Sequence, residues 1–178
     1  AHLWKNGEEE SLNLEKDITY AYDVAVNNGK VYVAGSQYRE AGAVKLFDAI
    51  VWEVGGTPIV LEIPAKVTSG ADVQTQTAEA KTIAFNNGSM YVGGSVDEGT
   101  NVRPYVWKDM ETTSPSNFGD AKGFVKNIKF VNNELYAFYG TTLLMGKKKS
   151  SDEDVKNYMT QAQGSGYADV AVSEGSVF

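Results

Sequence analysis

Residues 22–36 carry the pattern that decides the fold, YDVAVNNGKVYVAGS. Val24 and Val26 alternate with smaller or polar residues before Asn28-Gly29, and the alternation resumes after it. Alternation with a period of two around Asn-Gly is the strongest short-range signal for a β-hairpin, because a type I′ turn needs positive φ at both central residues. The stretch therefore predicts two adjacent antiparallel strands joined by a two-residue turn.

The same pattern returns three more times, at residues 81–95, 127–136 and 169–178. The copies begin about 40 to 60 residues apart, and each is expected to form a hairpin. Repeats of this length built from strand hairpins are the signature of β-propeller blades. We therefore expect an all-β fold, a β-propeller-type array of four antiparallel blades.

A second, looser pattern follows each hairpin and predicts the outer strands of each blade. It places Trp52 and Trp107 on short apolar strands, has leucine at the third copy, and recurs as Trp4 near the start of the chain. The fourth blade is thus expected to be shared between the N- and C-termini, although the shared repeat is about ten residues shorter than the others. We expect one domain over residues 1–178, whose approximate repeats are 17–64, 78–115, 122–160, and 166–178 plus 1–14.

Composition narrows the classes of function. A formal net charge of −7 argues against a nucleic-acid partner, whose phosphates require a basic face. No segment approaches the roughly 18 to 20 apolar residues that a transmembrane helix needs. The absence of cysteine removes disulfides, thiolate metal sites and cysteine nucleophiles. We expect a monomer or a homodimer, with no metal and no cofactor.

The chain resembles a bacterial, Bacteroidetes-like propeller-repeat family of largely uncharacterised exported proteins. Trp4-Lys5-Asn6-Gly7 and residues 24–35 carry this resemblance, and a more distant likeness to kelch repeats depends on Val92-Gly93-Gly94 followed by Trp107. The resemblance implies the propeller fold and an extracytoplasmic location, in the periplasm or at the cell surface. It implies no particular activity.

Two sets of residues share a repeat position, and each has two interpretations. The tryptophans at the shared position favour packing between blades over a ring of sugar platforms, because burying an aromatic side chain removes 150–250 Å² from water. Short polar residues at the start of the hairpins favour local contacts with backbone amides over a channel that holds an ion. These polar residues are Asp23, Thr82, Asn127 and Asp169.

Few residues suit catalysis. The single histidine, His2, offers almost nothing for a triad or a metal cluster. Residues 97–98 and 152–154 supply carboxylates, but adjacent acids in loops are usually solvated, and a glycosidase needs two carboxylates at a set separation. The inventory therefore favours a role without catalysis.

We expect a non-catalytic binding or scaffolding module that presents loops on a rigid ring, with a protein or a glycan as ligand. The predicted binding residues lie in the connections after the hairpins: Tyr38, Arg39, Asp97 and Glu98. One alternative is a carbohydrate-active hydrolase or lyase that uses loop carboxylates. Another is a structural half-propeller that completes its ring by homodimerisation.

Overall fold

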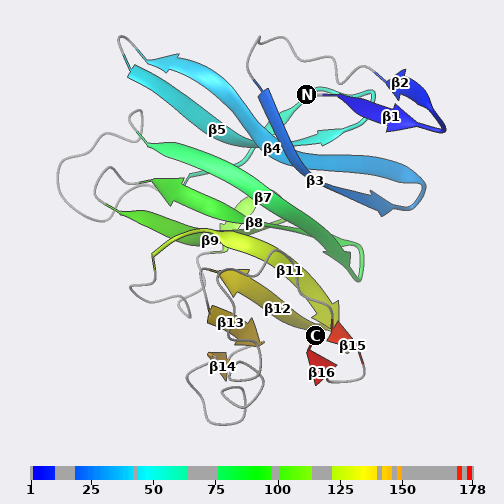
Figure 1. The fold of residues 1–178 in the computed structure, drawn as a ribbon, viewed down its shortest axis with the longest axis vertical. Helices are drawn as coiled ribbons and strands as arrows, with labels where there is room; N and C mark the ends of the chain where they lie inside the picture. Colours follow the sequence, from blue (N-terminus) through cyan, green and yellow to red (C-terminus); the bar gives the residue numbers. More distant parts are fainter. Residues whose placement is uncertain are drawn as a thin grey trace.

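The chain folds into a series of antiparallel β-sheets (Figure 1). The computed structural model describes residues 2–10, 19–41, 44–63, 76–97, 101–113, 122–139, 142–145, 148–149, 172–173 and 176–177. The regular structure in these ranges is entirely strand, which confirms the all-β prediction. No helix that could cross a membrane occurs in this part of the chain.

Three sheets of four strands follow one another along the chain, and each strand pairs with its neighbour in sequence. The first sheet contains β3 (Thr19–Asn27), β4 (Lys30–Ala41), β5 (Val44–Glu53) and β6 (Ile59–Val60). The second contains β7 (Thr77–Asn86), β8 (Ser89–Asp97), β9 (Val102–Lys108) and β10 (Glu111–Thr113). The third contains β11 (Val125–Val131), β12 (Glu134–Tyr139), β13 (Thr142–Met145) and β14 (Lys148–Lys149).

The two-residue turns predicted between the first and second strands are present in all three sheets. Asn28 and Gly29 have φ of 50° and 76°, and residues 87–88 and 132–133 likewise have positive φ at both positions. Asparagine tolerates this left-handed backbone better than other residues that carry a Cβ. Residues 174–175, the fourth predicted turn, lie outside the described residues.

A β-bulge interrupts the first strand of each sheet at the same repeat position. The pairing register shifts between Ala21 and Asp23 in β3, between Ala80 and Thr82 in β7, and between Val125 and Asn127 in β11. The extra residues are Tyr22, Lys81 and Lys126. A bulge bends its strand and changes the direction of the nearby side chains. In each first strand, the alternation of side chains between the two faces of the sheet is therefore interrupted at this residue.

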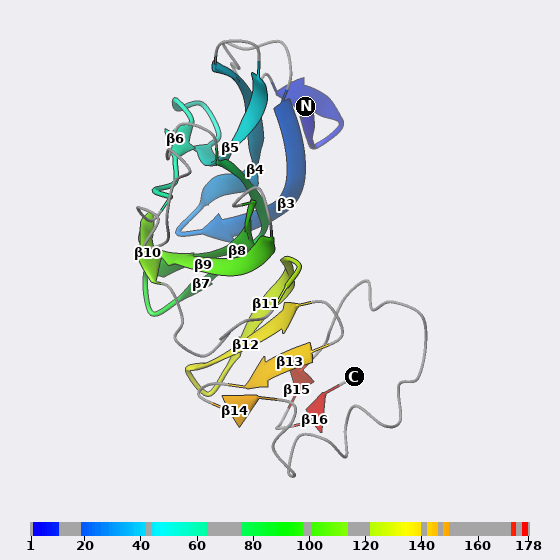
Figure 2. The ribbon, with the colours of Figure 1, turned by 90° about the vertical axis from the view of Figure 1, so that its left-hand side faces the viewer.

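The three sheets stack in chain order, with the first strands of successive sheets in contact (Figures 1 and 2). Ala34 and Val51 of the first sheet pack against Ile83, Val92 and other apolar residues of the second. Val106 of the second sheet lies in a further buried cluster with residues of the third. Apolar burial between neighbouring sheets therefore forms the core.

The tryptophans at the shared position differ in environment. Trp52 and Trp107 are buried, and the indole of Trp107 also donates a hydrogen bond to the carbonyl oxygen of Glu62 at 2.6 Å. The packing interpretation is confirmed for these two residues. It is wrong for Trp4 within the described structure, because Trp4 is exposed and stacks on His2.

The two ends of the chain form separate hairpins. β1 (Leu3–Lys5) pairs with β2 (Glu8–Glu10), and β15 (Val172–Ser173) pairs with β16 (Ser176–Val177). Figures 1 and 2 place these hairpins at opposite ends of the stack, where β15 contacts β11 and Leu3 packs against the first sheet. Among the described residues the two hairpins form separate two-stranded sheets, so the shared fourth blade predicted from the sequence is not formed there.

Near the bulges, backbone carbonyl oxygens of the first strands lie close to Gly35 and Gly94 in the second strands. This close approach predicts an effect of substitution on stability. A Cβ at Gly94 would lie 1.9 Å from the carbonyl oxygen of Glu79, and backbone cannot move aside cheaply. We expect Gly94→Ala to lower the free energy of unfolding by about 3 kcal/mol or more. Urea unfolding followed by far-UV circular dichroism measures this loss.

Gly29→Ala is the matched control, because its Cβ would meet nothing within 4 Å and only the positive φ of 76° opposes it. That strain is worth about 1–2 kcal/mol. An equal loss in the two variants would contradict the close approach at the bulge.

Candidate functional site

The sequence-predicted binding residues lie near the ends of the second strands. Tyr38 and Arg39 lie on β4 close to its connection with β5, and Asp97 is the last residue of β8. Glu98 lies outside the described residues. Tyr38 donates a hydrogen bond to Glu40 at 3.4 Å, and partial desolvation together with this carboxylate raises the pKa of Tyr38.

Arg39 makes contacts within the chain that join the first two sheets. Its Nε atom lies 2.8 Å from Oδ1 of Asp48, and its Nη2 atom donates to the carbonyl oxygen of the buried Gln76 at 3.3 Å. The backbone N–H of Phe47 donates to the hydroxyl of Thr77 at 2.7 Å. The end of the β4–β5 hairpin is therefore fixed against the start of β7.

A continuous row of aromatic and lysine side chains crosses the three sheets near the bulges. We call it the aromatic–lysine row, and its residues in order of contact are Lys45, Tyr38, Phe47, Tyr20, Tyr22, Lys81, Phe124 and Lys126. Successive members lie between 3.6 and 6.2 Å apart, measured between ring centroids or from Nζ to a centroid. Tyr20, Tyr22 and Phe124 are exposed, so the row presents aromatic surface to solvent.

The centre of the row is a compact polar cluster. Nζ of Lys81 lies 3.6 Å from the centroid of the Tyr22 ring, within the range of a cation–π interaction. Glu79 accepts a hydrogen bond from the Tyr22 hydroxyl at 2.7 Å and pairs with Lys81 at 3.0 Å. Burial and the hydrogen bond to Glu79 raise the pKa of Tyr22. The Tyr22 hydroxyl, the Glu79 carboxyl group and the Lys81 amino group therefore lie side by side at the centre of the row.

Asp23, at the repeat position of the predicted polar ring, joins neighbouring sheets. Its Oδ2 atom accepts hydrogen bonds from the Thr82 hydroxyl at 3.0 Å and from the Ile83 backbone N–H at 2.9 Å. Its Oδ1 atom accepts from the N–H of Val24 at 2.9 Å. Asp23 therefore binds backbone amides, which agrees with the favoured interpretation, but one of these amides belongs to the next sheet. Asp169 lies outside the described residues.

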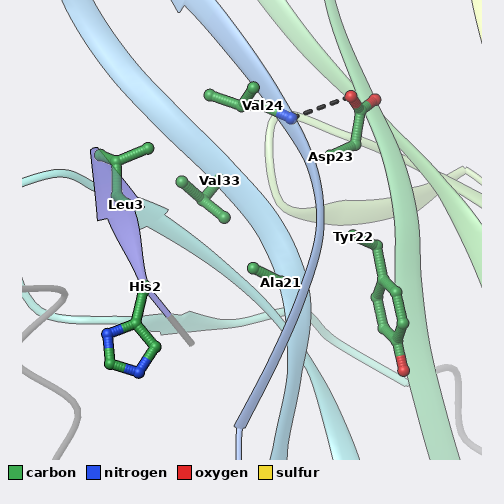
Figure 3. Close-up of a pocket in the computed structure, with 7 residues that line it drawn as sticks. All are labelled: His2, Leu3, Ala21, Tyr22, Asp23, Val24 and Val33. Carbon is green, nitrogen blue, oxygen red and sulfur yellow. Dashed lines mark hydrogen bonds between the residues drawn. The ribbon is translucent and has the colours of Figure 1, made fainter. Parts of the chain in front are cut away.

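A pocket of about 270 Å³ lies between β1 and β3 (Figure 3). Leu3, Val24 and Val33 give it apolar walls, and His2 stands at its edge. Figure 3 shows the Tyr22 ring directed away from Leu3 and toward the neighbouring strand of the second sheet. Tyr22 therefore belongs both to the residues that line the pocket and to the aromatic–lysine row.

The described residues hold no group of three or more histidine, cysteine, aspartate or glutamate side chains that could bind a metal ion. His2 forms an exposed contact with Glu9. Residues 98 and 152–154, the carboxylates of the hydrolase alternative other than Asp97, lie outside the described residues. Comparisons with family models, with curated proteins and with solved structures found no match to this chain.

Most of the row was missed by the sequence predictions, which named only Tyr38 among its members. Lys45 and Phe47 meet Tyr38 through strand pairing within the first sheet. Tyr22, Lys81 and Phe124 become neighbours through the bulges and the stacking of the sheets, and neither is visible in a pattern with a period of two. One signal was available, since Tyr22, Lys81 and Lys126 occupy the same position just before the polar residue of each repeat.

The contacts of Asp23 predict a loss of stability on truncation. Asp23→Ala leaves the buried hydroxyl of Thr82 and the N–H of Ile83 without an acceptor, so we expect a loss of about 1–3 kcal/mol in the free energy of unfolding. Asp23→Asn keeps one acceptor oxygen and should lose less. Urea unfolding of the wild type, Asp23→Ala and Asp23→Asn tests this order. An unchanged free energy of unfolding for Asp23→Ala would show that the sheets are held together without this contact.

The raised pKa of Tyr22 predicts its behaviour at alkaline pH. The native hydroxyl holds its proton more tightly than in the unfolded chain, so this contribution to stability is complete below the unfolded pKa and is lost as pH rises through the native one. Subtracting the 295 nm titration of Tyr22→Phe from that of the wild type should reveal a tyrosine that ionises above pH 10.0, the ordinary value. A midpoint at or below that value would contradict the contact with Glu79.

Proposed function

We propose that this chain is a non-catalytic binding module with a β-propeller-type architecture. Three successive four-stranded antiparallel sheets, each paired in chain order, support the architecture. The first strands also contact one another in sequence, from β3 to β7 to β11 to β15. Such an order is expected where the first strands line the inner side of a propeller.

The observation that carries the binding role is the aromatic–lysine row. Tyrosine rings combine a large apolar face with a polar tip, which is why they are enriched in binding surfaces. Exposed Tyr20, Tyr22 and Phe124 offer faces on which a sugar ring or an apolar side chain can stack. The carboxylate of Glu79 and the ammonium groups of Lys81 and Lys126 provide an acceptor and donors beside these faces.

The scaffold supports this role because the row is held in place from several sheets. Arg39 and Thr77 fix the β4–β5 hairpin to β7, and Asp23 fixes β3 to β7. A site whose side chains are positioned before the ligand arrives loses less conformational entropy on binding. The ligand is a glycan or an extended protein segment, and both can stack on exposed rings while they exchange hydrogen bonds with the cluster.

This proposal predicts binding that depends on the row. A glycan array and a peptide-display library are screened with the wild-type chain, and each retained probe is titrated by calorimetry. We expect Tyr20→Ala and Lys81→Ala to weaken binding at least tenfold, about 1.4 kcal/mol, because each removes a contact face or a charge at the centre.

Met110→Ala is the control, since Met110 is an exposed apolar residue in the β9–β10 turn at the other end of the strands. Circular dichroism verifies that all variants are folded. Equal affinities for the wild type, the row variants and the control would place the ligand elsewhere, and two screens without a retained probe would contradict the binding role.

A further inference from the structure

The first sheet leaves exposed an apolar face that the other two sheets bury. Val24 and Val26 of β3 are 52% and 68% exposed. The residues at the position of Val24 are Ile83 and Ile128, which are only 5% and 2% exposed. The three sheets share one repeat and one strand order, so the difference lies in what covers each sheet.

In the second and third sheets, the residues equivalent to Val24 and Val26 are covered by the sheet that precedes them in the chain, through its first and second strands. Tyr32 of β4 packs on Phe85, with ring centroids 5.0 Å apart, and Tyr91 of β8 packs on Phe130 at 4.6 Å. Phe85 and Phe130 stand at the repeat position of Val26. A first and second strand lying against Val24 and Val26 would therefore extend an interface that the chain already makes twice.

The β1–β2 hairpin covers only part of the same face. Leu3 packs on Val33, Ile50 and Trp52, as the third strand of a preceding sheet would. The pocket of about 270 Å³ in Figure 3 lies beside Leu3 and reaches Val24, where the first and second strands of that sheet would lie. β1 and β2 are thus the outer half of a sheet whose inner half is not supplied by neighbouring described strands.

Trp4 shows that the outer face of β1 also lacks its cover. Trp4 is 62% exposed, whereas Trp52 and Trp107 at the same repeat position are 1% and 0% exposed. In the second sheet this tryptophan belongs to the buried cluster that joins it to the sheet before it. A single neighbour that placed a complete sheet before β1–β2 would cover both Trp4 and the face formed by Val24 and Val26 of β3.

We propose that this neighbour is a second copy of the chain, docked head to tail, whose β15–β16 hairpin completes a sheet with β1–β2. β15–β16 is the inner half of a repeat, and in the sequence Phe178 occupies the repeat position of Tyr32 and Tyr91. Within one chain this hairpin packs near β11, at the opposite end from β1. In a dimer, the β15–β16 hairpin of each copy can pair with the β1–β2 hairpin of the other copy. These two contacts are equal, and together they close a ring. The inference is independent of the ligand proposed for the aromatic–lysine row.

The mass in solution tests the docking. Light scattering should give twice the 19.3 kDa of the chain, and the double variant Val24→Arg/Val26→Arg should run as a monomer. Both valines are exposed in the single chain, so the variant is expected to fold. The control is Ile59→Arg/Val60→Arg, which places the same charges on two exposed apolar residues of β6 and should leave the doubled mass unchanged.

Trp4 provides a second readout in the same samples. Dilution below the assembly concentration should shift the tryptophan emission to longer wavelength and make one of the three tryptophans accessible to acrylamide, since Trp52 and Trp107 are buried within the chain. A monomer at high concentration with Trp4 already accessible would overturn the proposal.

Cross-linking distinguishes a second copy from closure within one chain. The chain contains no cysteine, so Val26→Cys and Ser176→Cys can be introduced separately and mixed with a flexible bismaleimide. We expect a cross-linked heterodimer whose linked peptides contain both positions. A double variant that yields only an intramolecular link, with no product between chains, would overturn docking of a second copy and favour a ring closed by one chain.

Discussion

One extra residue in each first strand connects the architecture to the candidate site. Tyr22, Lys81 and Lys126 are these residues, and the side chains of Tyr22 and Lys81 reach residues of the neighbouring sheet. The same distortion brings the Glu79 carbonyl so close to β8 that only glycine fits at position 94. A glycine required by packing and a lysine at the centre of the row therefore have one structural cause. Bulges are common beside functional sites because they re-aim side chains without disturbing the rest of a sheet.

The sequence was informative wherever the structure depends on local backbone chemistry. Asn28-Gly29 and its counterparts predicted the hairpins, because positive φ at two adjacent residues is a local demand that few residue types meet. Burial of Trp52 and Trp107 was predicted from their shared position. Trp4 has the same position but a different environment, since burial depends on which sheet lies against it. A repeat pattern identifies equivalent positions, but it does not show whether each has a neighbour.

The candidate site was less predictable, because the residues at its centre meet through contacts between sheets. Tyr38 was expected in a binding loop and does belong to the row, whereas Arg39 uses its guanidinium to hold Asp48 and Gln76. The composition of a loop cannot distinguish these roles, since both residue types are common in binding surfaces. Glu79 had no signal of its own. Lys81 shares a repeat position with Tyr22 and Lys126, but that position did not reveal its contact with Tyr22 in another sheet.

Burial that depends on a neighbouring sheet also bears on the exposed apolar residues at the end of the stack that carries β1 and β3. An array in which each unit contacts only adjacent units needs polar terminal faces if it is to remain open in water. Here the terminal face carries Val24, Val26 and Trp4, all exposed and apolar, and the repeat gives no polar substitutes at these positions. Charged residues are common elsewhere in the sequence, which has 16 lysines and arginines and 23 aspartates and glutamates, so the apolar character of this face is distinctive. The apolar end is better explained as one side of an interface, because it keeps the residue types that the internal sheets bury.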